Sequence, residues 1–153
     1  MRVKKGEVRA QKALSRYEKD VGLKQVDFFK PLRHRDRLKL LSICKHGVLT
    51  RGKVLIEQGR TPENFWVLLS GEVDIYSFKE GQETPFHTTR QSGVCLGEGV
   101  ILGAAQRNAK VIAKTDIELL EFTGLDVRLL TEEDEEFGSR FYFAIATVLY
   151  FRK

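Results

Sequence analysis

Cysteine and histidine are scarce in this 153-residue sequence, and their positions exclude the commonest local metal motifs. The two cysteines, Cys44 and Cys95, lie far apart, and the three histidines, His34, His46 and His87, are scattered. Zinc sites built from cysteine and histidine need closely spaced pairs of ligands. A cupin-type barrel enzyme would typically carry a His-x-His pair on one strand, and the sequence has none. We therefore predict no metal site, and a cupin-type enzyme is a weak alternative.

Motifs of covalent catalysis and phosphoryl transfer are missing as well. The sequence contains no Gly-x-Ser-x-Gly nucleophile elbow and no Gly-x-x-x-x-Gly-Lys-Ser/Thr phosphate loop. The tripeptide His-Arg-Asp at residues 34–36 matches part of the kinase catalytic loop, but its partner motifs are absent. We interpret it as a coincidence, because a tripeptide is a weak signal. The protein is predicted not to be an enzyme and to carry no cofactor.

Long apolar runs are absent too. A membrane-spanning helix needs about 18 or more consecutive apolar residues. The longest run here, residues 144–151, is short and is interrupted by Thr147. The first residues are basic but no apolar stretch follows them, so a secretory signal is not expected. We predict a cytoplasmic protein without a membrane span, whose two cysteines are free thiols.

Positive charge is concentrated at one end of the chain. Residues 1–25 hold eight lysines or arginines and three acids, which accounts for the whole formal net charge of +5. Good helix formers without proline or glycine predict a helix over residues 7–20. A basic segment can contact nucleic acid or a membrane surface. Interleaved aromatic residues that would stack on bases are lacking, and a solvated helix is the interpretation we favour.

Hydrophobic periodicity divides the rest of the chain into helix, β-structure and helix. Residues 36–45 have the pattern of a short amphipathic helix. Between residues 46 and 123, apolar residues recur at every second position in short runs separated by glycine-containing turns, which predicts a β-sandwich or barrel. Residues 125–130, and then a segment opened by the acidic run 132–136, return to helical spacing. The expected fold class is mainly β with flanking helices.

The segment at residues 93–109 is the most informative for function. It is rich in glycine and alanine and carries one acid, Glu98, and one arginine, Arg107, nine positions later. Small residues let a ligand approach the backbone, free backbone N–H groups bind anions, and arginine offers a planar fork for phosphate. These properties describe a nucleotide pocket, although a glycine-alanine loop with a surface ion pair explains the same residues.

Several motifs, taken in order, resemble the cyclic-nucleotide-binding domain family of catabolite activators and protein kinase A regulatory subunits. Gly97-Glu98 followed by Arg107 is similar to the family's phosphate-binding cassette, which reads Phe-Gly-Glu, apolar residues, then Pro-Arg-Ala-Ala. The resemblance covers residues 26–153. Its other motifs are Phe-Phe-Lys-Pro-Leu at 28–32, Val-Leu-Ile-Glu-Gln-Gly at 54–59, Trp-Val-Leu-Leu-Ser-Gly-Glu-Val at 66–73 and Ala-Lys-Thr-Asp-Ile-Glu-Leu at 113–119.

The resemblance implies a definite architecture and function. The basic helix at residues 1–25 would precede one cyclic-nucleotide-binding domain at residues 26–153. This domain would form an eight-stranded jelly-roll β-barrel over residues 46–123, followed by C-terminal helices over residues 125–153. The implied function is that of a regulatory sensor that binds a cyclic mononucleotide, cAMP more readily than cGMP, and transmits binding through the C-terminal helix.

The resemblance also implies roles for the cassette residues. Glu98 would accept a hydrogen bond from the ribose 2′-hydroxyl, and Arg107 would pair with the cyclic phosphate. Backbone N–H groups of Gly97, Asn108 and Ala109 would complete the phosphate cradle. The alternative is a domain of this fold that has lost ligand binding and serves protein–protein interaction. It rests on departures from the family pattern at Gly99, Val100, Gln106, Asn108 and Lys110, of which Gly99 is expected to loosen the cassette helix.

The last helix carries an apolar stripe at spacings of three and four, formed by Phe137, Phe141, Ala144, Ile145, Val148 and Leu149. Such a stripe must be buried against something. We predict a homodimer through residues 141–151, with packing inside the monomer as the alternative. The sequence given ends at Lys153, too soon after the last helix for a helix-turn-helix, so no DNA-binding domain is expected in this chain. The protein partner is unknown.

Overall fold

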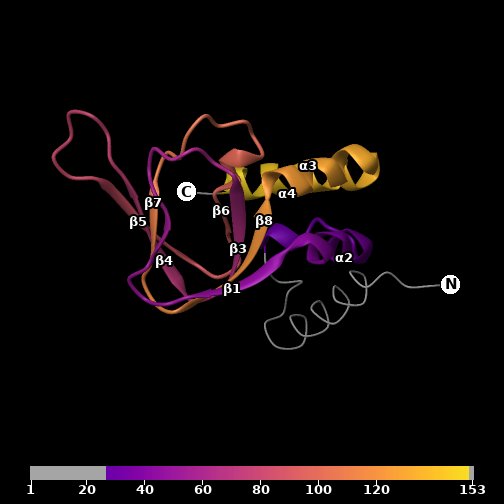
Figure 1. The fold of residues 1–153 in the computed structure, drawn as a ribbon, viewed down its shortest axis with the longest axis horizontal. Coiled ribbons are helices and arrows are strands. Elements are labelled where there is room, and N and C mark those ends of the chain that lie inside the picture. Colours follow the sequence, from indigo (N-terminus) through magenta and orange to yellow (C-terminus); the bar gives the residue numbers. More distant parts are fainter. Residues whose placement is uncertain (1–26, 152–153) are drawn as a thin grey trace.

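The computed structural model describes residues 27–151 and arranges them as eight strands with helices gathered at one end (Figure 1). The predicted basic helix lies outside the described residues. The helices are η2 (Asp27–Phe29, a 3-10 turn), α2 (His34–Ile43), η3 (Glu98–Val100), α3 (Gly124–Glu133) and α4 (Glu135–Phe151). The strands are β1 (Lys45–Leu49), β2 (Val54–Ile56), β3 (Asn64–Ser70), β4 (Glu72–Ser77), β5 (Phe86–Gln91), β6 (Cys95–Leu96), β7 (Lys110–Ala113) and β8 (Ile117–Thr123).

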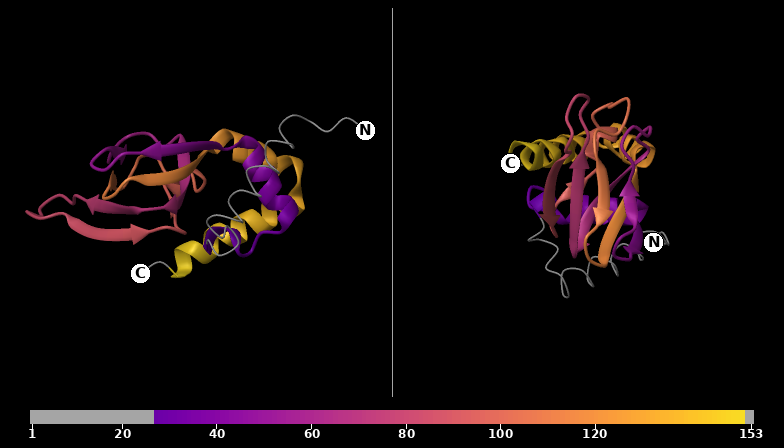
Figure 2. Two further views of the ribbon diagram at one scale, coloured as in Figure 1. Left: turned by 90° about the horizontal axis from the view of Figure 1, so that it is seen from below. Right: turned by 90° about the vertical axis from the view of Figure 1, so that its left-hand side faces the viewer.

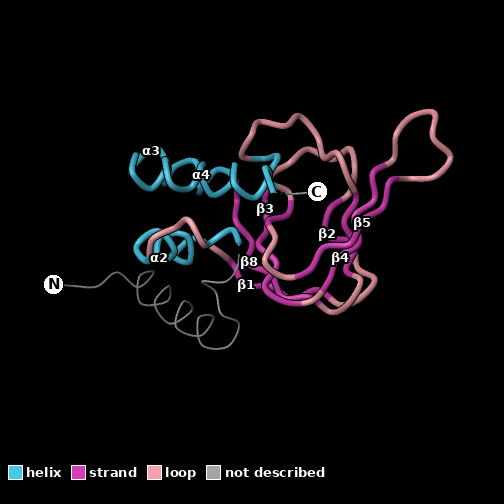
Figure 3. Tube along the Cα trace, turned by 180° about the vertical axis from the view of Figure 1, so that it is seen from behind, coloured by secondary structure: helices cyan, strands magenta, loops and turns pink. Residues whose placement is uncertain are grey.

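The strands form two four-stranded antiparallel sheets, in the orders β1-β8-β3-β6 and β2-β7-β4-β5. Figure 2 shows the sheets stacked on each other with the helices at one end. Figure 3 shows the β4–β5 hairpin loop projecting away from the helices. The prediction of a mainly β fold with eight strands and flanking helices is confirmed. Closure of the strands into a barrel stays a prediction.

Two apolar cores explain why β3 lacks the expected alternation of buried and exposed residues. On one face of β3, Trp66 and Leu68 pack between the two sheets. On its other face, Phe65 and Val67 pack against the helices. The Phe65 ring stacks on Phe122 of β8, with ring centroids 4.9 Å apart. A strand covered on both faces reads as a continuous apolar run, as this one does.

Helix α2 begins two residues earlier than expected because Asp36 caps it. The Asp36 carboxylate accepts a hydrogen bond of 2.9 Å from the backbone N–H of Arg33. The same carboxylate receives two hydrogen bonds from Arg140 of α4, of 2.6 and 2.9 Å. Asp36 is completely buried. Asp36, the last residue of the tripeptide at 34–36, therefore connects α2 to α4.

The predicted apolar stripe of α4 is largely buried inside the monomer. Phe137, Phe141 and Ala144 are fully buried, and Ile145 is only 2% exposed. The monomer packing that we had treated as the alternative therefore holds for these four residues. The aromatic residues that remain exposed on α4 are Tyr142, Phe143, Tyr150 and Phe151. Among residues 27–151, no helix combines the length and apolarity needed to cross a bilayer.

Candidate functional site

A pocket of about 600 Å³ lies at the glycine-rich segment. All five predicted site residues, Gly97, Glu98, Arg107, Asn108 and Ala109, line it. Small or apolar side chains make up most of the remaining lining, including Ile56, Ile75, Val94, Leu96, Ala104 and Val111. The structure thus brings the Glu98 carboxylate and the Arg107 guanidinium into a shared cavity, although they are separated in sequence. Their roles toward a ligand stay predictions.

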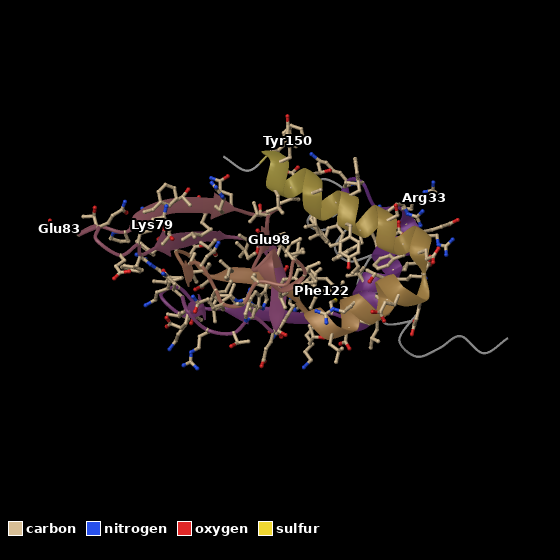
Figure 4. The ribbon with its side chains drawn as sticks, turned by 90° about the horizontal axis from the view of Figure 1, so that it is seen from above. Arg33, Lys79, Glu83, Glu98, Phe122 and Tyr150 are labelled. Atoms are coloured by element: carbon tan, nitrogen blue, oxygen red, sulfur yellow. The ribbon has the colours of Figure 1, made fainter. Side chains whose placement is uncertain are left out.

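Glu98 is the first residue of the 3-10 turn η3, and the residue before it, Gly97, has a conformation and close neighbours that require glycine. Gly97 has φ +76°, in the left-handed region that side chains rarely adopt. A Cβ at this position would lie 2.7 Å from Nη1 of Arg107 and 3.2 Å from Trp66. Glu98 is only 8% exposed. It lies near the middle of the molecule, between the strands and α4 (Figure 4).

Arg107 is held in place by the backbone and by an aromatic ring. Its Nη1 donates a hydrogen bond of 2.8 Å to the Gly97 carbonyl, and its Nη2 donates to the Asn64 carbonyl. The guanidinium lies 5.5 Å from the centre of the Trp66 ring, within cation–π range. The Trp66 indole N–H in turn donates to Glu121, at 3.2 Å. These contacts fix the direction in which the guanidinium points.

Burial and a nearby carboxylate act on Arg107 in opposite senses. Burial lowers the pKa of Arg107 below its ordinary value, while the negative charge of Glu98 raises it. Because the ordinary arginine pKa lies far above neutrality, the guanidinium stays charged. The pocket therefore carries a permanent cation, and Glu98 is the only acid among the described residues that line it.

The loop that carries Arg107 is fastened to neighbouring segments on both sides. The Arg107 N–H donates to the Arg60 carbonyl at 2.7 Å, and its carbonyl accepts from the Gly59 N–H at 2.9 Å. The Ser77 hydroxyl donates to the Asn108 carbonyl at 3.1 Å. The predicted turn glycine at position 59 thus helps to position the cassette. These bonds place Asn108 and Ala109 on the pocket wall.

One departure from the family pattern has a local reason in the structure. We expected Gly99 to loosen the cassette turn relative to alanine. A Cβ at position 99 would lie 3.2 Å from Cβ of Ala104, which is tighter than ordinary van der Waals contact. The Ala104 N–H donates to the Gly99 carbonyl at 2.9 Å, so the two residues are held together. Glycine therefore suits this close approach.

Sequence reasoning missed the wall that faces the cassette. Phe86, Thr88 and Arg90 of β5 line the pocket at alternate positions. The sequence predicts a strand here, but the alternation of side chains along a strand does not show which of its two faces lines a pocket. Leu149 of α4 also lines the pocket. The C-terminal helix thus contacts the cavity. Strand β6, whose residues Cys95 and Leu96 also line the pocket, was not predicted from the sequence.

Comparison with known proteins agrees with this arrangement. The model of the family described as "Cyclic nucleotide-binding domain" matches residues 47–134. The chain belongs to this family. The resemblance identified from the sequence motifs is thereby confirmed, and the match includes the whole glycine-rich cassette from Gly97 to Ala109.

Curated relatives are regulatory subunits of protein kinases. The cAMP-dependent protein kinase regulatory subunit of Colletotrichum orbiculare is 30% identical over 97 residues, which cover 63% of this chain and 24% of the relative. The subunit of the same description from Aspergillus fumigatus is 31% identical over 97 residues, covering 63% of this chain and 23% of the relative. The chain thus spans about a quarter of the length of these relatives.

Solved structures share the fold. The regulatory subunit of a cAMP-independent protein kinase A from Trypanosoma cruzi, bound to guanosine, superposes with a TM-score of 0.70 at 18% identity. The alignment covers 82% of this chain and 42% of that one. The N-terminal domain of a transcriptional regulator from Streptomyces coelicolor A3(2) gives a TM-score of 0.69 at 21% identity, covering 84% of this chain and 91% of that one.

Proposed function

We propose that this domain is a regulatory sensor that binds a cyclic mononucleotide in the pocket at Glu98 and Arg107. The observation that carries the proposal is the pairing of a buried carboxylate with an anchored guanidinium in one cavity of about 600 Å³. A cavity of this size lies in the range of small-molecule sites. Membership of the cyclic nucleotide-binding domain family supports the same ligand class.

The phosphate is assigned to Arg107. A guanidinium has five N–H donors, so it can hold the Gly97 and Asn64 carbonyls and still donate to a cyclic phosphate. Its position over Trp66 prevents it from swinging freely, which lowers the entropy cost of binding. Backbone N–H groups of Gly97, Asn108 and Ala109 are the proposed remaining donors of the cradle.

The ribose is assigned to Glu98. Its carboxylate accepts a hydrogen bond from the 2′-hydroxyl in this proposal, which distinguishes cyclic ribonucleotides from their 2′-deoxy analogues. The sequence resemblance and the curated kinase relatives both point to cAMP ahead of cGMP. That order rests on the relatives, and no contact to a base supports it. A cytoplasmic location and the absence of enzymatic activity also stay predictions from the sequence.

We assign to α4 the transmission of ligand binding from the pocket to a partner. Leu149 lines the pocket and is only partly buried, so a ligand that fills the cavity would touch the helix directly. A ligand shifts such an equilibrium only by the difference in its affinity for the two positions of the helix. The signal would then pass to whatever contacts the end of α4.

Calorimetric titration with cAMP and cGMP tests the proposal. We expect binding to the unaltered protein and a loss of about 2–5 kcal/mol in Arg107→Ala, because a phosphate would be left without its charged partner. Fluorescence of Trp66, the only tryptophan in the sequence, should respond to ligand because it lies against Arg107. Arg128→Ala, on the exposed face of α3, is the matched control.

Two results would contradict the proposal. If Arg107→Ala stays folded in thermal unfolding and binds as tightly as the unaltered protein, the phosphate site lies elsewhere. If the unaltered protein binds neither nucleotide, the alternative of a fold kept for protein–protein interaction takes its place.

We also propose that the exposed side of α4 forms a homodimer contact. Phe143 is 65% exposed and Tyr150 is 82% exposed, and Figure 4 shows Tyr150 at the outer end of α4. Aromatic residues are favoured at such contacts. Ile145 belongs to the monomer core, so charging it would unfold the domain and would not probe the contact. Light scattering should show a dimer that Phe143→Glu with Tyr150→Glu dissociates; a parent that stays monomeric at high concentration would exclude this contact.

A further inference from the structure

The segment of residues 59–64, which leads from the turn after β2 into β3, contacts the cassette arginine at both of its ends. The Gly59 N–H donates to the Arg107 carbonyl at 2.9 Å, and the Arg60 carbonyl accepts from the Arg107 N–H at 2.7 Å. At the other end, the Asn64 carbonyl accepts a hydrogen bond from Arg107 Nη2. The segment therefore holds both the backbone and the guanidinium of the residue to which the ligand phosphate is assigned.

Thr61 and Pro62 form the middle of this segment. Neither belongs to a helix or strand, and Thr61 is exposed. Pro62 lines the pocket, so Thr61 lies directly beside a lining residue. The carbonyl of the next residue, Glu63, accepts a hydrogen bond of 2.8 Å from the N–H of Gly124, where α3 begins. The segment is thus fixed between the cassette and the helices, with an exposed threonine at its centre.

Threonine followed by proline is the dipeptide that proline-directed protein kinases modify. Such kinases bind their substrates as extended chains, and a proline disfavours the helical conformation of the residue before it. Thr61 meets both requirements, because it is exposed and lies outside the helices and strands. We propose that Thr61 is the phosphorylation site of a proline-directed kinase, and that a phosphate at this position weakens the binding of cyclic nucleotides.

The modification changes the charge beside the cassette. The Thr61 hydroxyl oxygen attacks the γ-phosphorus of ATP, the bond to ADP breaks, and the hydroxyl proton passes to the catalytic carboxylate of the kinase. A neutral side chain thereby gains a charge of about −1.5 to −2 near pH 7. Because the ligand phosphate is also negative and is assigned to Arg107, the two phosphates would repel each other.

The expected effect on affinity follows from this repulsion. For charges of −2 and −1 about 10 Å apart in water, the repulsion lowers the affinity about fourfold. Salt screens such an interaction, whereas it would not restore a distorted pocket. The effect on affinity rests on the proposed function, because it needs a ligand phosphate at Arg107. The modification of Thr61 itself does not depend on that function.

A second Thr-Pro pair in the sequence provides a matched control. Thr84 and Pro85 lie in the β4–β5 loop, and Thr84 is exposed like Thr61. Figure 4 shows the preceding residue, Glu83, at the far tip of this loop and well away from Glu98. A phosphate at Thr84 adds the same charge far from the cassette, so it should leave the affinity for cyclic nucleotides unchanged.

The first measurement tests the modification. The intact protein is incubated with ATP and a mitogen-activated protein kinase, which is proline-directed, and mass spectrometry locates the phosphate. We expect phosphate at Thr61 and none at this position in Thr61→Val. This variant keeps the shape of the side chain and should bind cyclic nucleotides as the unaltered protein does. A kinase reaction that leaves Thr61 unmodified would overturn the assignment of the site.

The second measurement tests the effect on the pocket. Phosphothreonine is introduced during translation at position 61 or at position 84, and calorimetry gives the affinities for cAMP and cGMP at about 0.01 M and about 1 M salt. At low salt, phosphate at Thr61 should weaken both nucleotides about fourfold, and at high salt the difference should nearly vanish. Should the translated phosphoprotein fail to fold, the kinase-modified protein decides, because it folds before it is modified.

The outcomes separate the two proposals. If the unaltered protein binds neither nucleotide, the proposed function fails together with the effect on affinity, while mass spectrometry still decides the modification. If nucleotides bind but phosphate at Thr61 leaves their affinities unchanged, or weakens them equally at both salt concentrations, the function stands and this inference is overturned. The same holds if phosphate at Thr84 weakens binding as much as phosphate at Thr61.

Discussion

Substitution of Gly97 by alanine should damage the pocket beyond its cost in backbone strain. Gly97 has φ +76°, and an L-residue in the left-handed region costs about 1–2 kcal/mol. The added Cβ would also lie 2.7 Å from Arg107 Nη1, which now donates to the Gly97 carbonyl. If this displacement breaks that hydrogen bond, a further loss of about 1.5–3 kcal/mol follows, because the donor is charged.

Gly81 is the matched control for this substitution. Its φ is +82°, close to that of Gly97, but a Cβ there would meet nothing within 4 Å. Gly81→Ala should therefore cost only the backbone strain, about 1–2 kcal/mol. The difference between the two variants isolates the contact with Arg107 and Trp66.

Urea unfolding followed by Trp66 fluorescence measures both costs, since the sequence contains no other tryptophan. The Gly97 variant should also shift the emission of the folded protein, because the new methyl group would lie 3.2 Å from the indole ring. The same variant should bind cyclic nucleotide more weakly, while Gly81→Ala binds normally. A Gly97→Ala protein that is no less stable than Gly81→Ala, with unchanged emission, would show that Arg107 is not held as described.

Three further predictions concern the charged groups. Glu98→Gln should weaken cyclic ribonucleotides by about 1–3 kcal/mol in calorimetry but hardly affect 2′-deoxy analogues, and equal weakening of both would remove the ribose contact. Asp36→Ala should destabilise the domain by about 1–3 kcal/mol in urea, because it removes the buried acceptor of the Arg140 hydrogen bonds; a loss below 1 kcal/mol would argue against the pair. A hydrogen bond from Lys39 lowers the pKa of Asp134 from 3.8 to about 2. Ionised Asp134 therefore adds its full contribution to the free energy of unfolding above about pH 4, and this contribution is lost as the pH falls through 2. Acid unfolding followed by circular dichroism should show this dependence, and Asp134→Asn should reduce it.

The alternation of apolar residues and the glycine turns were enough to predict the sheets. Gly71, for example, has φ +89° between β3 and β4, where the turn was expected. Strand β6 was missed because two residues carry no period. Its identity as a strand depends on pairing with Trp66 and Val67, which the local sequence does not encode. Short elements of this kind are defined by their neighbours.

The cassette could be found from sequence, whereas the rest of the pocket could not. Glu98 and Arg107 lie nine residues apart in one unusual segment, so a local pattern contains both. Arg90 reaches the same cavity from another strand, and only the register of β5 against β4 turns it inward. The Asp36–Arg140 pair joins residues 104 positions apart, which no local spacing can reveal. The tripeptide at residues 34–36 resembled a catalytic motif, but its aspartate, Asp36, is one partner of that pair.

The two halves of α4 differ in how freely they can respond to a ligand. The first half is held by the fully buried Phe137 and Phe141 and by the Arg140–Asp36 hydrogen bonds to α2. Any movement of this half must break those contacts or carry α2 along. The last turns are only partly covered, and Leu149 among them reaches the pocket. Because segments with few buried contacts open at the lowest free-energy cost, ligand binding should slow amide hydrogen exchange at residues 146–151 far more than at residues 137–145. Equal protection of both halves would instead mean that α4 and α2 move as one rigid unit.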